Sequence, residues 1–194
     1  KTIKYFIQFL IISILFLIFK IVGLRYASFI SGKIVSLIGP FFRSKDLIEF
    51  NILRALPNLK RNEIENISKK MWNNYGRMLA EYVFIKDFRG SKFTNNIEII
   101  GQEILDKIKM NNEPVIFISG HFNNFELMAM QIEKSGIDLS AIYRPLNNKF
   151  LNFIMEKIRK KYICKNQVKK GISGTKQLLS FFKNKTSIAL MIDQ

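Results

Sequence analysis

The sequence is poor in cysteine, histidine and acidic side chains. Its 194 residues include one cysteine, Cys164, and one histidine, His121. A single cysteine excludes an intramolecular disulfide framework and a cysteine-ligated zinc site, and it favours a reducing compartment. We expect Cys164 to be a small buried side chain rather than a nucleophile, because no candidate base lies near it in the sequence.

Acidic residues are half as frequent as basic ones. The chain has 15 Asp and Glu against 31 Lys and Arg, a net charge of +16, and 48% of its residues are hydrophobic. A disordered basic tail would contain fewer apolar residues, and an ordinary soluble enzyme of this length would be nearer neutrality. The composition therefore predicts an anionic and apolar partner, a phospholipid surface or a phosphorylated lipid, with nucleic acid as the rival.

The positive charge lies at the two ends of the chain. Residues 1–45 contain seven basic side chains and no acidic one, residues 46–148 contain thirteen of each sign, and residues 149–194 contain eleven basic and two acidic. A run of like charges is also typical of a solvated helix face, which remains an alternative for the second group.

The amino-terminal segment is long and apolar. Residues 5–24 carry Lys20 as their single charge and have the length of about twenty residues that a helix needs to cross a bilayer. A signal peptide is disfavoured because no small-x-small cleavage pattern follows, and a buried core helix is disfavoured by the length, while an interfacial helix remains an alternative to the membrane anchor. Residues 27–42 are also apolar, and Lys33 and Arg43 beside them favour an element lying on anionic headgroups. Basic residues are more numerous after the anchor, which favours a cytoplasmic location for the remaining chain.

From Asp46 onward the sequence alternates between helical and strand patterns. Alternation of this kind predicts an α/β fold with a mostly parallel sheet flanked by helices, whose functional loops leave the carboxyl ends of the strands. We expect strands at residues 97–100, 115–118, 139–143 and 187–192, and helices at residues 46–56, 62–88, 102–110, 124–135, 148–162 and 172–182.

His121 directly follows the most apolar expected strand. Glu126, five residues later, would lie in the first turn of the next helix, where its carboxylate could accept a hydrogen bond from one imidazole nitrogen. The other nitrogen would then be available to remove a proton from a hydroxyl group. Two structural alternatives stay open: Asn123 and Glu126 have the spacing of a capping box, and His121 could be a structural histidine.

Residues 120–126, Gly-His-Phe-Asn-Asn-Phe-Glu, resemble the His-x4-Glu motif of the lipid A biosynthesis acyltransferases, the late lauroyl and myristoyl transferases of Gram-negative bacteria. The resemblance extends in family order over nearly the whole chain. Two departures stand out: many members have Gly-Asn-Trp before the motif's glutamate, and many have Arg-x-Arg where this chain has Arg-Lys-Lys. The other matching segments are residues 72–77 with Glu81, residues 143–146, Arg159 with Lys160, and Asp193 with Gln194.

The resemblance implies an acyltransferase with a glycerolipid-acyltransferase-like α/β fold and an amino-terminal membrane-anchoring helix. It implies transfer of a fatty acyl group from an acyl carrier protein thioester to a hydroxyl of a 3-hydroxyacyl chain on a lipid A precursor, with no cofactor or metal. Expected partners are acyl carrier protein, the lipid A precursor and the anionic phospholipid membrane, and not nucleic acid. The expected location is the inner membrane, with the catalytic domain on its cytoplasmic face.

The resemblance also implies roles for particular residues. His121 and Glu126 would form a general-base dyad. Arg159 and Arg144 would bind substrate phosphate or stabilise negative charge, with Arg159 the stronger candidate. Asp193 would be a buried polar orienter or an active-site carboxylate, or else a turn residue. We expect residues 1–45 to form the anchor and interfacial segment and residues 46–194 a catalytic domain truncated at its carboxyl end, since the family continues beyond the Asp-Gln pair.

Two other functions remain open. A glycerophospholipid acyltransferase also has a histidine four residues clear of a carboxylate, but there an Asp typically replaces Glu126 and an Asn usually replaces Gly120. A non-enzymatic basic protein that binds membranes or nucleic acid is the second alternative. It lacks support because the sequence contains no recognition-helix, zinc or aromatic RNA-binding signature.

Overall fold

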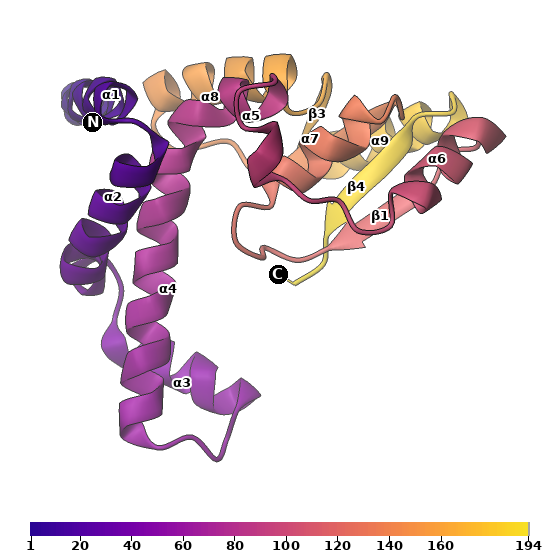
Figure 1. The fold of residues 1–194 in the computed structure, drawn as a ribbon. Helices are drawn as coiled ribbons and strands as arrows, with labels where there is room; N and C mark the ends of the chain where they lie inside the picture. The colour runs from indigo at the N-terminus through magenta and orange to yellow at the C-terminus, as the bar shows by residue number, and fades with distance from the viewer. Residues whose placement is uncertain (194) are drawn as a thin grey trace. The chain divides into compact units, whose positions relative to one another are not determined.

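The computed structural model describes residues 1–193 (Figure 1). The internal contacts divide the chain into two compact units. Unit 1 consists of Lys1–Ser13 and Ile85–Gln194, and unit 2 of Ile14–Phe84. The first helix, α1 (Thr2–Val22), contributes to both units. The expected domain boundary after residue 45 stays a prediction.

Unit 1 is built on a parallel sheet. Within residues 1–193 it has four strands in the order β1-β4-β2-β3, and every neighbouring pair is parallel. This confirms the α/β class and the parallel sheet, while the glycerolipid-acyltransferase-like architecture stays a prediction. The strands are β1 (Ile116–Ser119), β2 (Leu139–Tyr143), β3 (Asn166–Lys169) and β4 (Ser187–Met191).

Helices cover both faces of this sheet. Ile142 packs with Val168 and Leu178 in an apolar cluster beneath one helix, α9. The next residue, Tyr143, points to the opposite face because side chains alternate along a strand, and it contacts another helix, α8. The helices of unit 1 besides α1 are α5 (Ile85–Arg89), α6 (Gln102–Asn111), α7 (Glu126–Lys134), α8 (Lys149–Tyr162) and α9 (Ile172–Lys183).

The start of α8 is fixed by Asn148. Its side-chain oxygen accepts hydrogen bonds from the backbone amides of Phe150 and Leu151, which satisfies two of the free donors at the helix start. Its side-chain nitrogen donates to the carbonyl of Tyr5 at 2.8 Å, in the first half of α1. The buried Asn148 therefore both begins α8 and ties it to the amino-terminal segment of the same unit.

The strands of the structure differ from the expected ones at two places. Residues 97–100 form no strand: they lie between a 3-10 turn, η3 (Thr94–Asn96), and Gly101, whose φ of 89° interrupts an extended chain. Strand β3 was not expected, because within Asn-Gln-Val-Lys the single apolar side chain is Val168. That side chain is almost fully buried and its strand is held by pairing with β2.

Unit 2 is helical. Most of the segment 27–42, expected to lie on headgroups, belongs to a helix (α2) that buries Ser28, Ser31 and other small residues on one face. Ser31 Oγ donates to the carbonyl of Gly76 on α4 at 2.6 Å, and most of the longer apolar side chains of α2 are exposed. The elements of unit 2 besides α1 are α2 (Leu24–Ile38), η1 (Gly39–Phe42), α3 (Lys45–Ala55), α4 (Arg61–Glu81) and η2 (Tyr82–Phe84).

Helix α1 has the dimensions of a membrane span. Among the described residues it is the one helix long and apolar enough to cross a bilayer, with a mean hydropathy of 2.5 and 6% of the relevant stretch buried. These criteria concern length and composition, which a signal sequence or a core helix can also meet. Membrane association is therefore weakly supported, and the anchor and its orientation stay predictions.

Candidate functional site

The sheet order brings His121 and Asp193 together. Strands β1 and β4 are parallel neighbours, with Ser119 paired to Met191, so the residues that follow each strand leave the same edge of the sheet. His121 Nδ1 lies 2.8 Å from Asp193 Oδ1, and the backbone amide of His121 donates to Asp193 Oδ2, also at 2.8 Å. One carboxylate thus fixes both the backbone and the ring of the histidine.

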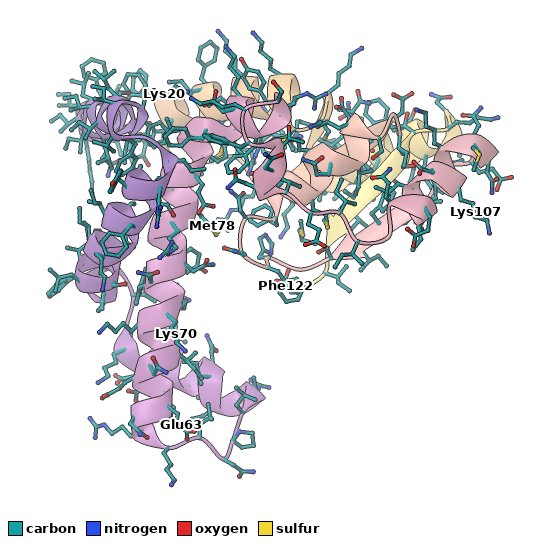
Figure 2. The ribbon with its side chains drawn as sticks, in the orientation of Figure 1. Lys20, Glu63, Lys70, Met78, Lys107 and Phe122 are labelled. Carbon is teal, nitrogen blue, oxygen red and sulfur yellow. The ribbon has the colours of Figure 1, made fainter. Side chains whose placement is uncertain are left out.

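The loop carrying the histidine has a specific backbone. A Cβ on Gly120 would lie 3.2 Å from Asp193 Oδ2 and 3.0 Å from the ring of Phe122, so a glycine allows this close approach. Asn123 has a φ of 45°, which asparagine tolerates better than most residues. The ring of Phe125 meets the imidazole edge to face, with centroids 4.8 Å apart. Phe122 lies on the outside of the loop (Figure 2).

The electrostatics favour a charged Asp193 and a defined imidazole tautomer. The hydrogen bond from the backbone amide of His121, and next that from its ring, hold the pKa of the Asp193 carboxyl below its usual value. An ionised carboxylate is an acceptor only, so Nδ1 of His121 must carry the proton in the hydrogen bond. In the neutral ring, the lone pair is then on Nε2.

Glu126 forms an ion pair with Arg159. Glu126 Oε1 accepts a hydrogen bond from Arg159 Nε at 2.8 Å and a second, short one from Nη2. Both side chains are about nine-tenths buried, at 10% and 13% exposed. Glu126 lies in the first turn of α7 and Arg159 in the last turn of α8, where the helix dipoles favour negative and positive charge respectively.

Tyr143 and Glu156 extend this cluster. The Arg159 guanidinium lies 5.6 Å from the centre of the Tyr143 ring, and the Tyr143 hydroxyl donates to Glu156 Oε1. Burial and the neighbouring Glu156 raise the pKa of Tyr143, while the hydrogen bond from Tyr143 lowers that of Glu156. Glu156 is not among the expected site residues, although its place three residues before Arg159 on α8 is a signal that could have indicated it.

Four of the five expected site residues therefore form two clusters in unit 1, His121 with Asp193 and Glu126 with Arg159. Within residues 1–193 no hydrogen bond joins His121 to Glu126, so the expected dyad stays a prediction. Arg144 is exposed, and its guanidinium has no hydrogen bond or ion pair to any other described residue. In the same part of the chain, no three His, Cys, Asp or Glu side chains are grouped as metal ligands.

Comparison with known proteins identifies the family. The family described as bacterial lipid A biosynthesis acyltransferase matches residues 1–194. Over 131 residues the chain is 22% identical to the lipid A biosynthesis myristoyltransferase of Escherichia coli (strain K12). The aligned region covers 68% of this chain and 40% of that protein, so the chain spans less than half of this relative. Because the family match extends over every residue, the chain belongs to the bacterial lipid A biosynthesis acyltransferase family.

Proposed function

We propose that the protein transfers a fatty acyl group from an acyl carrier protein thioester to a hydroxyl of a 3-hydroxyacyl chain on a lipid A precursor. The family match supports this reaction class. The observation that carries the proposal is the imidazole of His121, held by Asp193 at the carboxyl ends of two parallel strands. The thioester is the activated donor, and the proposed reaction requires no other cofactor.

In the proposed mechanism His121 is the general base. A hydroxyl group is a weak nucleophile, and removal of its proton by Nε2 during attack on the thioester carbonyl makes it a stronger one. Asp193 holds Nδ1–H and stabilises the imidazolium that forms. The tetrahedral intermediate then collapses, the carbon–sulfur bond breaks, and the imidazolium returns the proton to the departing thiolate.

Glu126 and Arg159 have a supporting role in this proposal. Their ion pair joins the first turn of α7 to the last turn of α8, so Glu126 holds the Arg159 guanidinium in one orientation. A guanidinium so oriented is suited to bind a phosphate or to stabilise a developing oxyanion. Arg144, exposed after β2, is the weaker candidate for contact with a phosphorylated acceptor.

The proposed location is the cytoplasmic face of the inner membrane. Helix α1 supports membrane anchoring by its length and hydropathy. The basic side chains of residues 1–45 would contact anionic headgroups, and those of residues 149–194 would contact the acidic carrier protein. Resistance of the protein to extraction by alkaline carbonate would support anchoring, whereas release into the supernatant would contradict it.

The reaction can be tested with membranes that contain the protein. Labelled acyl carrier protein thioester is supplied with either a tetraacylated lipid A precursor or lysophosphatidate, and the labelled products are separated. We expect incorporation into the lipid A precursor, and a loss of about 10²–10⁴-fold in the H121A variant. K107Q, an exposed change on α6, should act like wild type. Incorporation into lysophosphatidate alone, or into neither acceptor, would contradict the proposal.

A further inference from the structure

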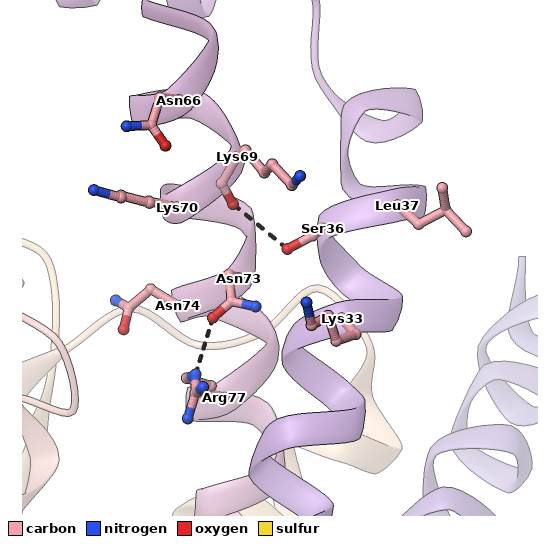
Figure 3. Close-up of a pocket in the computed structure, with 9 residues that line it drawn as sticks. All are labelled: Lys33, Ser36, Leu37, Asn66, Lys69, Lys70, Asn73, Asn74 and Arg77. Atoms are coloured by element: carbon pink, nitrogen blue, oxygen red, sulfur yellow. Dashed lines mark hydrogen bonds between the residues drawn. The ribbon is translucent and has the colours of Figure 1, made fainter. Parts of the chain in front are cut away.

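A basic groove lies between α2 and α4 in unit 2. It has a volume of about 700 Å³ and is lined by side chains of both helices (Figure 3). Four of the lining residues are basic and none is acidic. The remainder are three asparagines, one serine and one leucine, and the full set is Lys33, Ser36, Leu37, Asn66, Lys69, Lys70, Asn73, Asn74 and Arg77.

Close packing of the two helices forms this groove. A Cβ on Gly32 would lie 2.9 Å from Asn73 Nδ2, and one on Gly76 would lie 2.3 Å from the carbonyl oxygen of Ser31. The small residues therefore let the helix backbones approach closely, and the longer side chains project along the seam. Arg77 Nε donates to Asn73 Oδ1 at 2.9 Å, which fixes one donor-rich side of the groove (Figure 3).

The charge of the groove is not neutralised by nearby acids. Within residues 1–193, Lys33, Lys69 and Lys70 form no ion pair. Glu65, near the start of α4, is instead paired with Arg61 and Lys45. Glu81, near the end of α4, accepts a hydrogen bond from Ser28. Several ammonium groups and one guanidinium beside amide donors are the chemistry that binds a phosphate group.

The surroundings of the groove favour a lipid over a free phosphate. Leu37 lines it and is 75% exposed, and the neighbouring Phe41 and Phe42 of η1 are 87% and 77% exposed. Ile34 and Ile38 on α2 are exposed as well. A cationic groove bordered by exposed apolar side chains matches a molecule with an anionic head and apolar chains.

We propose that this groove binds the phosphate headgroup of a lipid. Lys33, Lys69, Lys70 and Arg77 contact the phosphate oxygens, Asn73 and Asn74 add neutral donors, and the acyl chains lie along the exposed apolar side chains of α2 and η1. The groove belongs entirely to unit 2 and shares no residue with the His121 cluster. The proposal is therefore independent of the acyl-transfer reaction.

The test measures binding of short-chain lipids to the full chain in a zwitterionic detergent. Dihexanoyl phosphatidic acid is titrated into the protein by calorimetry, beside dihexanoyl glycerol, which lacks the phosphate, and inorganic phosphate, which lacks the chains. We expect the phosphatidic acid to bind at least about tenfold more tightly than either fragment. Equal binding of dihexanoyl glycerol, or equal binding of inorganic phosphate, would overturn the proposal.

Two matched variants locate the site. K33Q/K69Q/K70Q removes three charges from the groove and should weaken phosphatidic acid binding at least about tenfold. K107Q/K176Q/K183Q removes the same charge from exposed positions in unit 1 and should change it less than about twofold. Circular dichroism is recorded for both variants to check that they are folded.

Equal weakening by both variants would show non-specific charge attraction and overturn the proposal. The wild-type protein could instead bind no lipid but bind acyl carrier protein or an oligonucleotide tightly. If K33Q/K69Q/K70Q then lost that binding, the groove would be assigned to that partner and the lipid proposal would be overturned. The H121A variant should bind phosphatidic acid like wild type, which separates failure of this proposal from failure of the acyl-transfer proposal.

Discussion

The carboxylate of Asp193 accepts hydrogen bonds from both the backbone amide and the Nδ1 atom of His121, 72 residues earlier in the chain, each at 2.8 Å. Parallel pairing of β1 with β4 produces this contact, because the loops that follow the two strands leave the sheet side by side. The contact leaves Nε2 as the proton-accepting nitrogen of the ring. The same residue pair is therefore the first target for mutation.

Replacing Asp193 should impair catalysis more than folding. In D193N the side-chain NH₂ group would face the backbone amide of His121 or its ring, so one of the two hydrogen bonds is lost and the tautomer is no longer fixed. We expect kcat to fall about 10²–10⁴-fold with KM little changed, measured with labelled acyl carrier protein thioester and lipid A precursor. Near-normal kcat in a folded D193N protein would remove Asp193 from the mechanism.

The buried pair of Glu126 and Arg159 should matter for stability. In E126Q the guanidinium of Arg159 loses its ionic partner in an environment where both side chains are about nine-tenths buried. We expect the free energy of unfolding to fall by about 3–5 kcal/mol, as measured by denaturant unfolding in detergent. E65Q breaks the exposed pair of Glu65 and Arg61 and should cost less than about 1 kcal/mol.

The E126Q and R159Q variants together distinguish two roles for Glu126. If Glu126 acts by orienting His121, E126Q should lower kcat strongly without a change in unfolding free energy. If it acts through Arg159, stability and activity should fall together, and R159Q should show the same loss of stability. Unchanged stability in E126Q would therefore contradict the role that the ion pair indicates and favour the His121–Glu126 dyad.

The sequence was sufficient to predict the local features of this site. It was insufficient to predict which side chains bond to His121 and Glu126. His121 could be placed at the end of a buried strand because residues 115–118 are uniformly apolar. Its contact with Asp193 depends on β4 inserting between β1 and β2, and strand order is set by long-range packing that spacing does not encode. Glu126 has the spacing to meet His121, but in the structure its carboxylate bonds Arg159, 33 residues later.

The prediction of secondary structure is wrong where tertiary contacts decide whether a segment forms a strand. Residues 97–100 have the β-branched side chains of a strand, yet no neighbouring strand pairs with them in the described part of the chain, and Ile100 is 92% exposed. Strand β3 has a polar sequence but pairs with β2, and burial of Val168 stabilises it. The periodic pattern of residues 62–88 correctly predicts the long helix α4, because such a pattern is local. It does not predict that α4 ends at Glu81 and that the following residues form η2 and the short helix α5.

Cys164 should be chemically inert in the folded protein. Its side chain is fully buried, and burial raises the pKa of the thiol to about 12. At pH 8 only about one thiol in ten thousand is then ionised, so alkylation by iodoacetamide should be on the order of a thousandfold slower than for a free cysteine peptide. Mass spectrometry follows the reaction, and unfolding in denaturant should restore the ordinary rate. Fast alkylation of the native protein would contradict this burial.

The raised pKa of Cys164 also predicts a pH dependence of stability. Between the ordinary thiol pKa and about 12, the unfolded chain has lost the thiol proton while the folded chain retains it. The folded state then binds more protons, so the free energy of unfolding falls as pH rises through this range. The C164A variant removes this contribution. The difference in unfolding free energy between wild type and C164A should therefore shrink with rising pH, and a constant difference would contradict the assignment.

Gly76 should be essential for the packing of α2 on α4. A Cβ at this position would lie 2.3 Å from the carbonyl oxygen of Ser31, which is backbone and cannot rotate away. The helices would have to separate, which would also weaken the hydrogen bond from Ser31 Oγ to the Gly76 carbonyl. Overpacking of this kind costs about 1–3 kcal/mol, so G76A should lower the midpoint of thermal unfolding measured by circular dichroism.

The matched control is G90A. A Cβ on Gly90 would lie 3.5 Å from the nearest atom, which is an ordinary contact, and Gly90 is exposed. The melting temperature of the G90A protein should therefore be close to that of wild type. G76A should also weaken binding of dihexanoyl phosphatidic acid, because separating α2 from α4 moves Lys33 away from Lys69 and Lys70. A G76A protein with wild-type stability would show that the helices tolerate a wider spacing. The close approach would then not be what sets the shape of the groove.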